Sequence, residues 1–228
     1  MRPLLHRLAP AGIAATLAGA LALSAPGAAP AAGGDVRPFA SVVRALAPGE
    51  RAAMTPAAWR PGCPVHIRAL RVVVMRHHDF GGRVRIGRLV VHNDVARDVV
   101  RAFARMYRAR VPIRRMIPIE RLGGDDSRSV DADNTSAFNC RTVAGTSRYS
   151  QHAYGRAIDI NPRENPYVRS DGYVRDPAAR PFIRRKPVRR GMAVEGGTMV
   201  RAFDALGWEW GGRWRGDLDY QHFSRDGG

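Results

Sequence analysis

Four side chains in two separate segments of the chain have the types and spacing of a catalytic metal site. The first segment contains His152 and Asp159, and the second contains Asp219 and His222. Two imidazoles, one carboxylate and a water at an open position form a ligand set that zinc uses in hydrolysis. We therefore predict a single zinc ion on His152, Asp159 and His222. Asp219 is predicted to be the general base that takes a proton from that water, or else to orient His222.

The residues around the first segment explain how its two ligands could meet. In a strand at residues 157–160, the two isoleucines would face the core and Asp159 would face a cleft on the other side. A gap of seven residues separates His152 from Asp159 and fits no helical face, but Gly155 allows a tight turn between them. In the second segment, Phe223 would point into the core and hold its strand in place.

The sequence before the motif predicts a strand, a glycine turn, a second strand and a helix. Apolar residues alternate at 65–74 and again at 86–92, with a turn at 77–82 between them. The dipeptide at 93–94 resembles a helix cap, and apolar residues then recur every three or four positions over 95–107.

Three segments around the motif have weaker patterns. Residues 123–136 are polar and acidic without the spacing of an EF-hand, which favours a solvated loop over a calcium site. Residues 169–190 are rich in Pro and Arg and are expected to form a long irregular loop that borders the site. Thr198 is expected to cap a short helix, and the tryptophans and glycines of 207–212 to form a strand edge near the cleft.

The N-terminal residues have the order of a secretory signal. Basic residues precede an apolar run of about a dozen residues, and small residues with proline follow. The run is short of the ~20 residues that span a bilayer, so no membrane span is expected after cleavage, and a retained anchor is the alternative. We predict a signal peptide at 1–31, a flexible lead-in at 32–61 and one domain at 62–226. The mature protein is expected to be a monomer that is secreted or held in the cell envelope.

The chain is strongly basic. Its 37 Lys and Arg residues exceed its 20 Asp and Glu residues, which gives a net charge of +17. Lys186 is the only lysine, so the charge is either a compositional bias spread over the surface or a patch that binds anionic cell-wall polymers. Nucleic-acid binding is not expected, because the sequence has no recognition helix, zinc-finger spacing or aromatic and basic RNA motif.

The two cysteines, Cys63 and Cys140, are far apart in the sequence. In an oxidising compartment they are expected to form a disulfide, and two buried free thiols are the alternative. Neither has a CxxC neighbour, which argues against thiolate ligands for zinc.

The motif as a whole is more specific than its parts. Ser-x-His-x-x-Gly-x-Ala-x-Asp begins at Ser150, and a stretch rich in tryptophan and glycine leads to Asp-x-x-His-Phe near the end of the chain. This combination resembles the VanY-like zinc D-alanyl-D-alanine carboxypeptidases, a group that includes D-Ala-D-Ala dipeptidases, phage L-alanyl-D-glutamate endopeptidases and the hedgehog signalling domain. The similarity is strongest over 134–168 and resumes over 208–223.

The resemblance implies a small α+β fold in which helices flank a central antiparallel sheet and zinc lies in a cleft on that sheet. It implies the same three zinc ligands and a catalytic acid and base in Asp219. It also implies an arginine that stabilises the oxyanion and holds the substrate, for which Arg141 is the best match. Three further residues are expected to bind the substrate or support the site: Ser150, Tyr154 and Trp210.

The predicted function is that of an exported zinc peptidase that hydrolyses peptidoglycan stem peptides, as a D-alanyl-D-alanine carboxypeptidase. Within the same chemistry, the alternatives are an L-alanyl-D-glutamate-type endopeptidase and a D-Ala-D-Ala dipeptidase. A different alternative is a non-catalytic protein that keeps zinc and binds the cell wall. Asp219 argues against it, because a structural zinc site needs no base beside an open coordination position.

Overall fold

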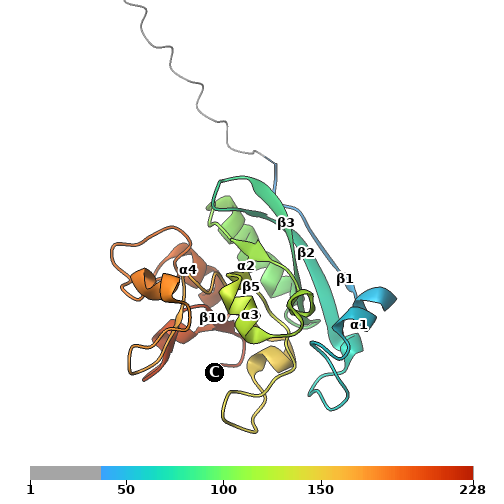
Figure 1. Cartoon of the computed structure of the whole chain (residues 1–228). Coiled ribbons are helices and arrows are strands. Elements are labelled where there is room, and N and C mark those ends of the chain that lie inside the picture. The colour runs from blue at the N-terminus through green and yellow to red at the C-terminus, as the bar shows by residue number, and fades with distance from the viewer. Residues whose placement is uncertain (1–36, 228) are drawn as a thin grey trace, which may run out of the picture. The chain divides into compact units, whose positions relative to one another are not determined.

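The computed structural model describes residues 37–227. The predicted signal peptide at 1–31 and the first part of the predicted lead-in lie outside these residues. The first sheet has three antiparallel strands in the order β1 (Ser41–Ala45), β2 (Leu70–His78) and β3 (Val84–His92) (Figure 1). Strands β2 and β3 form the hairpin that the alternating pattern predicted, with a shorter turn than expected.

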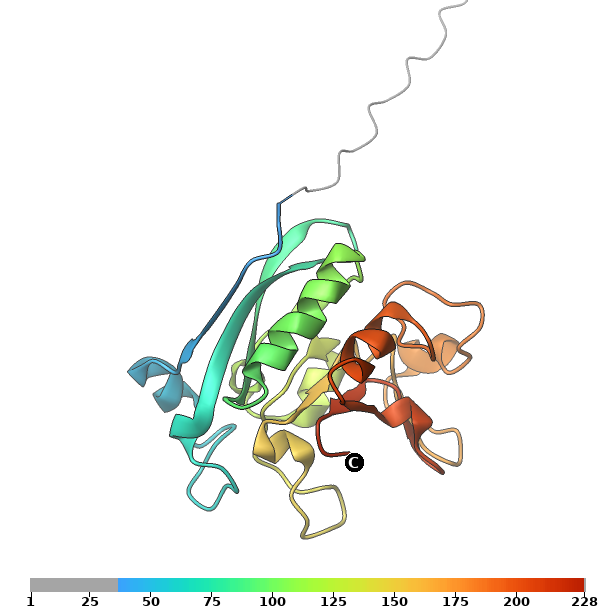
Figure 2. The ribbon, with the colours of Figure 1, turned by 180° about the vertical axis from the view of Figure 1, so that it is seen from behind.

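Helix α2 (Ala96–Arg108) lies across one face of the first sheet (Figure 2). Its apolar residues recur every three or four positions and form one buried face, as the sequence predicted. The buried residues of this face are Val95, Val99, Phe103, Met106 and Tyr107. The predicted cap at 93–94 differs, because Asp94 is bonded to His92 and Arg156 and Val95 precedes the helix without a side-chain cap.

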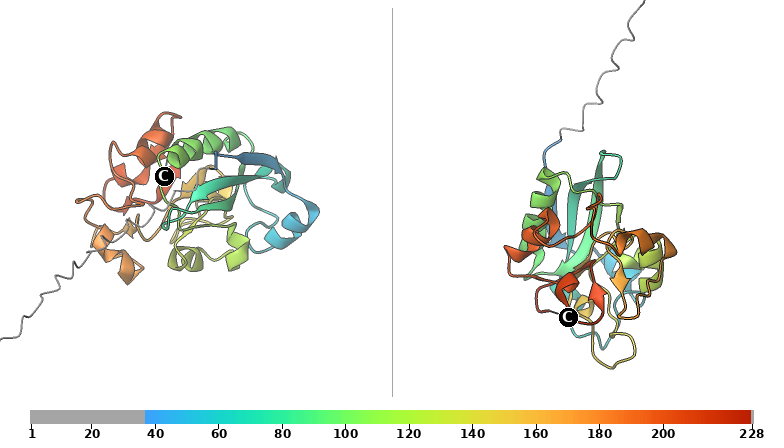
Figure 3. Two further views of the ribbon diagram at one scale, coloured as in Figure 1. Left: turned by 90° about the horizontal axis from the view of Figure 1, so that it is seen from above. Right: turned by 90° about the vertical axis from the view of Figure 1, so that its left-hand side faces the viewer.

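Residues that were predicted to form a flexible lead-in supply the edge strand of the first sheet and part of the cover on its opposite face. Strand β1 pairs with β2 along its whole length, and α1 (Pro48–Met54) follows it (Figure 3). Leu46, Met54 and Ala58 are buried against valines of β2 and β3. The described residues 37–61 are therefore part of the domain, because a few apolar side chains are enough to pack them onto the sheet.

The second sheet is built from short strands that are distant in sequence. Its order is β6 (Ala157–Asp159), β10 (His222–Ser224) and β8 (Glu209–Trp210), and both pairings are antiparallel. The resemblance implied one central sheet. The described chain instead has two small three-stranded antiparallel sheets beside helices, within a mixed α and β architecture.

Helix α4 (Thr198–Asp204) packs beside α2 and joins the two sheets into one core (Figure 2). Gly197, rather than Thr198, occupies its N-cap position. Phe203 of α4 stacks on Phe223 of β10 with ring centroids 4.5 Å apart. The buried cluster runs without interruption from the first sheet through both helices to the second sheet.

The remaining elements are short. Two further strand pairs are β4 (Arg115–Met116) parallel to β5 (Asn134–Thr135), and β7 (Tyr167–Val168) antiparallel to β9 (Leu218–Asp219). One more α-helix and five 3-10 turns complete the chain: α3 (Asp126–Asp131), η1 (Ile67–Ala69), η2 (Ile119–Leu122), η3 (Gln151–Tyr154), η4 (Pro177–Phe182) and η5 (Gly211–Arg213). Between residues 37 and 227, no helix has the length and apolar character needed to cross a bilayer.

The acidic segment at 123–136 is not the solvated loop that its composition predicted. It contains α3 and β5, and Asp133 is buried at 1% exposure. The guanidinium of Arg114 makes this burial possible, because its Nε lies 2.8 Å from Asp133 and its Nη2 lies 2.8 Å from the buried Glu164.

Candidate metal centre

His152 lies in η3, a short turn that begins after Ser150. The Ser150 hydroxyl accepts a hydrogen bond from the backbone N–H of His152 at 3.3 Å and so caps the start of the turn. Gly155 ends the turn with φ of 68°, and a Cβ there would lie 2.7 Å from the backbone nitrogen of His92. Glycine suits both the left-handed backbone and the close approach, so the chain can turn tightly from His152 into β6.

Asp159 and His222 are direct partners across the β6–β10 pairing. Side chains alternate between the two faces of a strand, and the neighbouring pair, Ile158 and Phe223, is fully buried in the core. Asp159 and His222 therefore point together to the other face. The alternation predicted from the sequence explains why these two ligands lie side by side.

Ligand atoms from three residues converge at this point. The Nε2 atom of His152 lies 3.1 Å from Oδ2 of Asp159 and 3.2 Å from Nδ1 of His222. The Nδ1 atom of His222 lies 3.2 Å from Oδ1 of Asp159. One ligand atom from each residue can be chosen so that all lie within 4.8 Å of one another, and all three residues are buried. The structure brings together the three residues that the sequence predicted as ligands.

The surroundings of this group fit a bound cation. The His152 ring donates its Nδ1–H to the carbonyl of Ala137 at 2.6 Å, which leaves the lone pair of Nε2 facing Nδ1 of His222. Two imidazole nitrogens this close need a proton or a metal ion between them. Two imidazoles and a carboxylate suit zinc. Among the described residues, the buried Nε2 of His222 has no hydrogen-bond partner.

The charges in the group also favour a cation. Burial opposes the ionisation of Asp159, but its interactions with His152 and His222 outweigh burial and hold the pKa of Asp159 well below its usual range. Burial likewise opposes the charged form of His152, yet Asp159 outweighs it and raises the pKa of His152. The Asp159 carboxylate is therefore ionised at neutral pH and attracts positive charge.

Asp219 lies at the end of β9, three residues before His222. Its Oδ1 is buried and has no hydrogen-bond partner within the part of the chain that the structure describes. Burial first, and the charge of Asp159 second, raise the pKa of Asp219 to about 7. Gly211 lets this strand end approach, since a Cβ at Gly211 would lie 2.5 Å from the Asp219 carbonyl oxygen. A carboxyl group with a pKa near neutrality can both accept and release a proton.

A cavity of about 410 Å³ opens beside these residues. His152, His222 and Asp219 line it, together with Trp214. Another part of its wall comes from the segment after β7, where side chains between residues 169 and 179 reach the cavity. The irregular loop predicted at 169–190 therefore does border the site.

The comparison with known protein families agrees with this geometry. The family model described as D-alanyl-D-alanine carboxypeptidase matches residues 144–225, a range that contains the three predicted ligands and Asp219. Over this segment the chain is similar to that family, which supports the resemblance found in the sequence. Its members are zinc peptidases of peptidoglycan, so the match supports a metallopeptidase and a metal site in the His-Asp-His group. No curated protein and no solved structure matches the chain.

Four arginines of the matched segment and its N-terminal flank line the cavity, and Arg141 and Arg148 are the two on the side of the hairpin before His152. Arg141 has its Nη2 3.2 Å from Asp126, while its Nε is buried without a hydrogen-bond partner among the described residues. Arg148 also lines the cavity, and within residues 37–227 its guanidinium forms no ion pair. The sequence predicted Arg141 at the site but not Arg148, because nothing in the spacing of Arg148 distinguishes it from the many other arginines.

The aromatic residues around the site lie at different depths. Tyr154 is half-buried in η3 and does not line the cavity. Trp210 is buried in the core, where its indole N–H donates to the carbonyl of Tyr220 at 2.8 Å and its ring stacks on Phe223. It therefore packs against the strand that carries His222 and not against the cavity. Trp214, which the sequence analysis passed over, lines the cavity with its ring centroid 5.2 Å from that of the His222 ring.

Proposed function

We propose that the protein is an exported zinc D-alanyl-D-alanine carboxypeptidase that removes the terminal D-alanine of peptidoglycan stem peptides. One observation carries the proposal. The buried His-Asp-His group opens onto a cavity that also contains an unpaired carboxylate oxygen of Asp219 and an unpaired guanidinium N–H of Arg141. A metal site that only stabilises a fold has no use for either group.

In this proposal, His152, Asp159 and His222 hold the ion. A bound zinc ion supplies Lewis-acid chemistry, which makes water more acidic and polarises a peptide carbonyl. Asp219 takes the proton of the attacking water and returns it to the leaving amine. No hydrogen bond joins Asp219 to His222 in the described chain, which favours this role over the alternative of orienting the imidazole.

The arginines would act on the substrate. Arg141 donates a hydrogen bond to the carbonyl oxygen as negative charge develops there. A carboxypeptidase must also recognise a terminal carboxylate. Two of the other arginines that line the cavity, Arg169 and Arg175, are engaged by Asp171 and Asp131. Arg148 has no such partner, so we assign the terminal carboxylate to it.

The setting of this activity is also part of the proposal. We expect the protein to act as a monomer outside the cytoplasm, on stem peptides and close to anionic cell-wall polymers that its net charge of +17 attracts. We also assign the domain to the hedgehog and DD-peptidase fold, which is supported by the antiparallel strands around the ligands. An endopeptidase of the same chemistry would need no carboxylate contact, and the unpaired Arg148 therefore favours the carboxypeptidase.

The test is hydrolysis of a pentapeptide that ends in D-Ala-D-Ala, with and without a chelator. We expect release of one terminal alanine, loss of the reaction with chelator, and a fall in kcat of about 10²-fold or more in Asp219→Asn with zinc still bound. Cleavage at another bond would favour the endopeptidase or the dipeptidase. Full zinc binding without any cleavage would favour the non-catalytic wall-binding protein.

A further inference from the structure

The segment at 137–141 connects the metal group to the cavity arginine. At its beginning, the carbonyl of Ala137 accepts the hydrogen bond from the His152 ring. In its middle, the backbone N–H of Asn139 donates to the carbonyl of His152 at 3.1 Å. At its end, the carbonyl of Arg141 accepts from the backbone N–H of Ser150 at 3.0 Å. One short stretch of backbone thus positions a proposed ligand and a proposed substrate contact.

The two ends of this segment are held by different parts of the fold. Near Ala137, Phe138 is buried and its N–H donates to the carbonyl of Val90 at 2.9 Å, while Ser136 and Asp159 exchange two backbone hydrogen bonds. The end that orients the His152 ring is therefore fixed by both sheets. Its anchoring uses no covalent bond.

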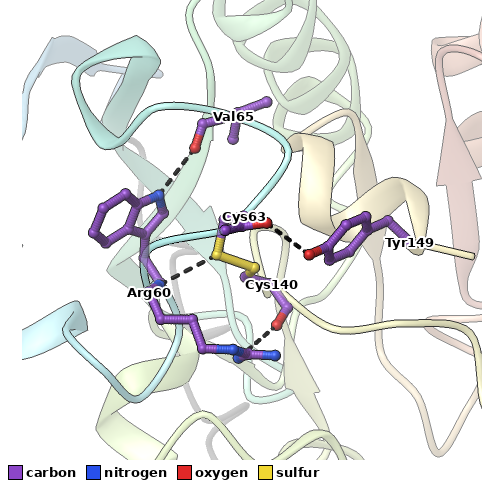
Figure 4. The surroundings of a disulfide bond; sticks show 7 residues. Arg60, Cys63, Val65, Cys140 and Tyr149 are labelled. Carbon is purple, nitrogen blue, oxygen red and sulfur yellow. Dashed lines mark hydrogen bonds between the residues drawn. A yellow bond between two sulfur atoms is a disulfide. The ribbon is translucent and has the colours of Figure 1, made fainter. Parts of the chain in front are cut away.

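The end that carries Arg141 is held by a disulfide instead. Cys140 is bonded to Cys63, and its carbonyl accepts from Arg60 at 3.0 Å (Figure 4). Its N–H donates to the carbonyl of Ala58 at 2.9 Å. This is the bridge that the sequence predicted. The disulfide and both of these hydrogen bonds join Cys140 to residues 58–63. The residue next to Arg141 is therefore held by a separate segment of the chain.

The hairpin that follows Arg141 has little else to hold it. Thr142 and Tyr149 form an isolated bridge at its base, and the Tyr149 hydroxyl donates to the carbonyl of Gly62 at 2.6 Å (Figure 4). The residues from 144 to 148 are exposed. Segments with few buried contacts open locally at low free energy. Both ends of this hairpin therefore depend on the region around Cys63.

We infer that the Cys63–Cys140 disulfide is a positioning device for Arg141, and that substrate turnover depends on it while metal binding does not. This inference rests on the proposed function for its catalytic readout. Displacement of a substrate-positioning group by about 1 Å can lower a rate by ~10²-fold, so a loosened Arg141 is enough for a large effect. The ligands should be spared, because Asp159 lies in β6 and the His152 ring is bonded to Ala137, whose neighbours are fixed by the sheets.

The first experiment is a double-mutant cycle on the full-length, zinc-loaded protein. Cys63→Ala with Cys140→Ala is combined with Arg141→Gln, and kcat/KM for the D-Ala-D-Ala pentapeptide is measured below the melting temperature of every variant. We expect the cysteine changes to lower kcat/KM by about 10–100-fold in the wild-type background and by less than about twofold in Arg141→Gln. Zinc content should stay the same throughout. Equal losses in both backgrounds, or loss of zinc, would overturn the inference.

A matched control separates positioning from stability. Val99→Ala removes buried volume from α2, far in sequence from the bridge, and also lowers the melting temperature. We expect Val99→Ala to keep kcat/KM of the folded protein within about twofold of wild type. A fall in kcat/KM equal to that of the cysteine variant would mean that the bridge acts only through global stability.

Hydrogen exchange gives a readout that needs no peptidase activity. Without the bridge, the amides of Cys140 and Ser150 should exchange faster, while those of Ile158 in β6 and Leu89 in β3 keep their wild-type protection. Unchanged protection of Cys140 and Ser150 would refute the positioning role, even if the protein proved not to be a peptidase. If the cysteine variant fails to fold, the same measurements apply to folded wild type after reduction by a dithiol. That reaction transfers two electrons and two protons to the bridge and leaves two thiols and the oxidised dithiol.

Discussion

Phe223 is the residue through which the core should control the metal ligands. It is fully buried and follows His222 directly in β10. Its ring stacks on Phe203 at 4.5 Å and on Trp210 at 6.4 Å. Replacing it by alanine would remove the packing that holds this strand against the core.

The size of the effect follows from these contacts. A buried Phe→Ala change lowers the free energy of unfolding by about 3–5 kcal/mol, and two stacked partners place Phe223→Ala in the upper part of that range. Domains have about 5–15 kcal/mol of stability, so the variant should remain mostly folded. The imidazole of His222 would lose its support, and we expect zinc affinity to fall by about 10–100-fold, as for other groups that orient a ligand.

The assay pairs urea unfolding with zinc competition against a chromophoric chelator. Phe103→Ala is the control, since Phe103 belongs to the same core, is 2% exposed, and lies on α2 rather than on a ligand strand. We expect similar losses of stability in the two variants and a loss of zinc affinity in Phe223→Ala only. Equal losses of zinc affinity would refute the idea that β10 packing sets the ligand geometry.

Two other predictions concern the cavity and a buried carboxylate. Arg148→Gln should raise KM about tenfold for a peptide with a free terminal carboxylate but not for its amide. As a control, Arg97→Gln at an exposed position should change neither KM value. Equal KM values in Arg148→Gln and wild type would remove Arg148 from the binding site. Burial and the charge of Asp133 raise the pKa of Glu164 to about 7. Between pH of about 4.5 and 7, the folded state therefore holds a proton that the unfolded state releases. The stability that this group contributes falls as the pH rises through that range. Glu164→Gln should therefore gain about 3 kcal/mol relative to wild type between pH 4 and pH 8 in urea titrations, and a pH-independent difference would show that Glu164 ionises normally.

The ligand group could be predicted from the sequence because local rules determine it. Alternation in β6 and β10 fixes which side chains face the core, and Gly155 marks the turn that returns His152 to Asp159. The helix α2 was equally predictable, because its apolar spacing repeats over three turns.

The other parts depend on contacts between distant residues. Residues 41–58 have no periodic pattern. Only Leu46, Met54 and Ala58 become buried, and they do so by packing on strands that lie later in the sequence. The charge of Asp133 predicts an exposed side chain, but the residue is buried because Arg114 lies beside it. The cavity wall at Arg148 likewise requires several loops to meet, and such meetings leave no mark in local spacing.

The most direct test of the metal centre is X-ray diffraction at the zinc absorption edge from crystals of the full-length protein. We predict one anomalous peak, about 2.0–2.2 Å from Nε2 of His152, Nδ1 of His222 and a carboxylate oxygen of Asp159. A zinc-loaded protein with its only peak elsewhere, or with no peak between these three residues, would contradict the account.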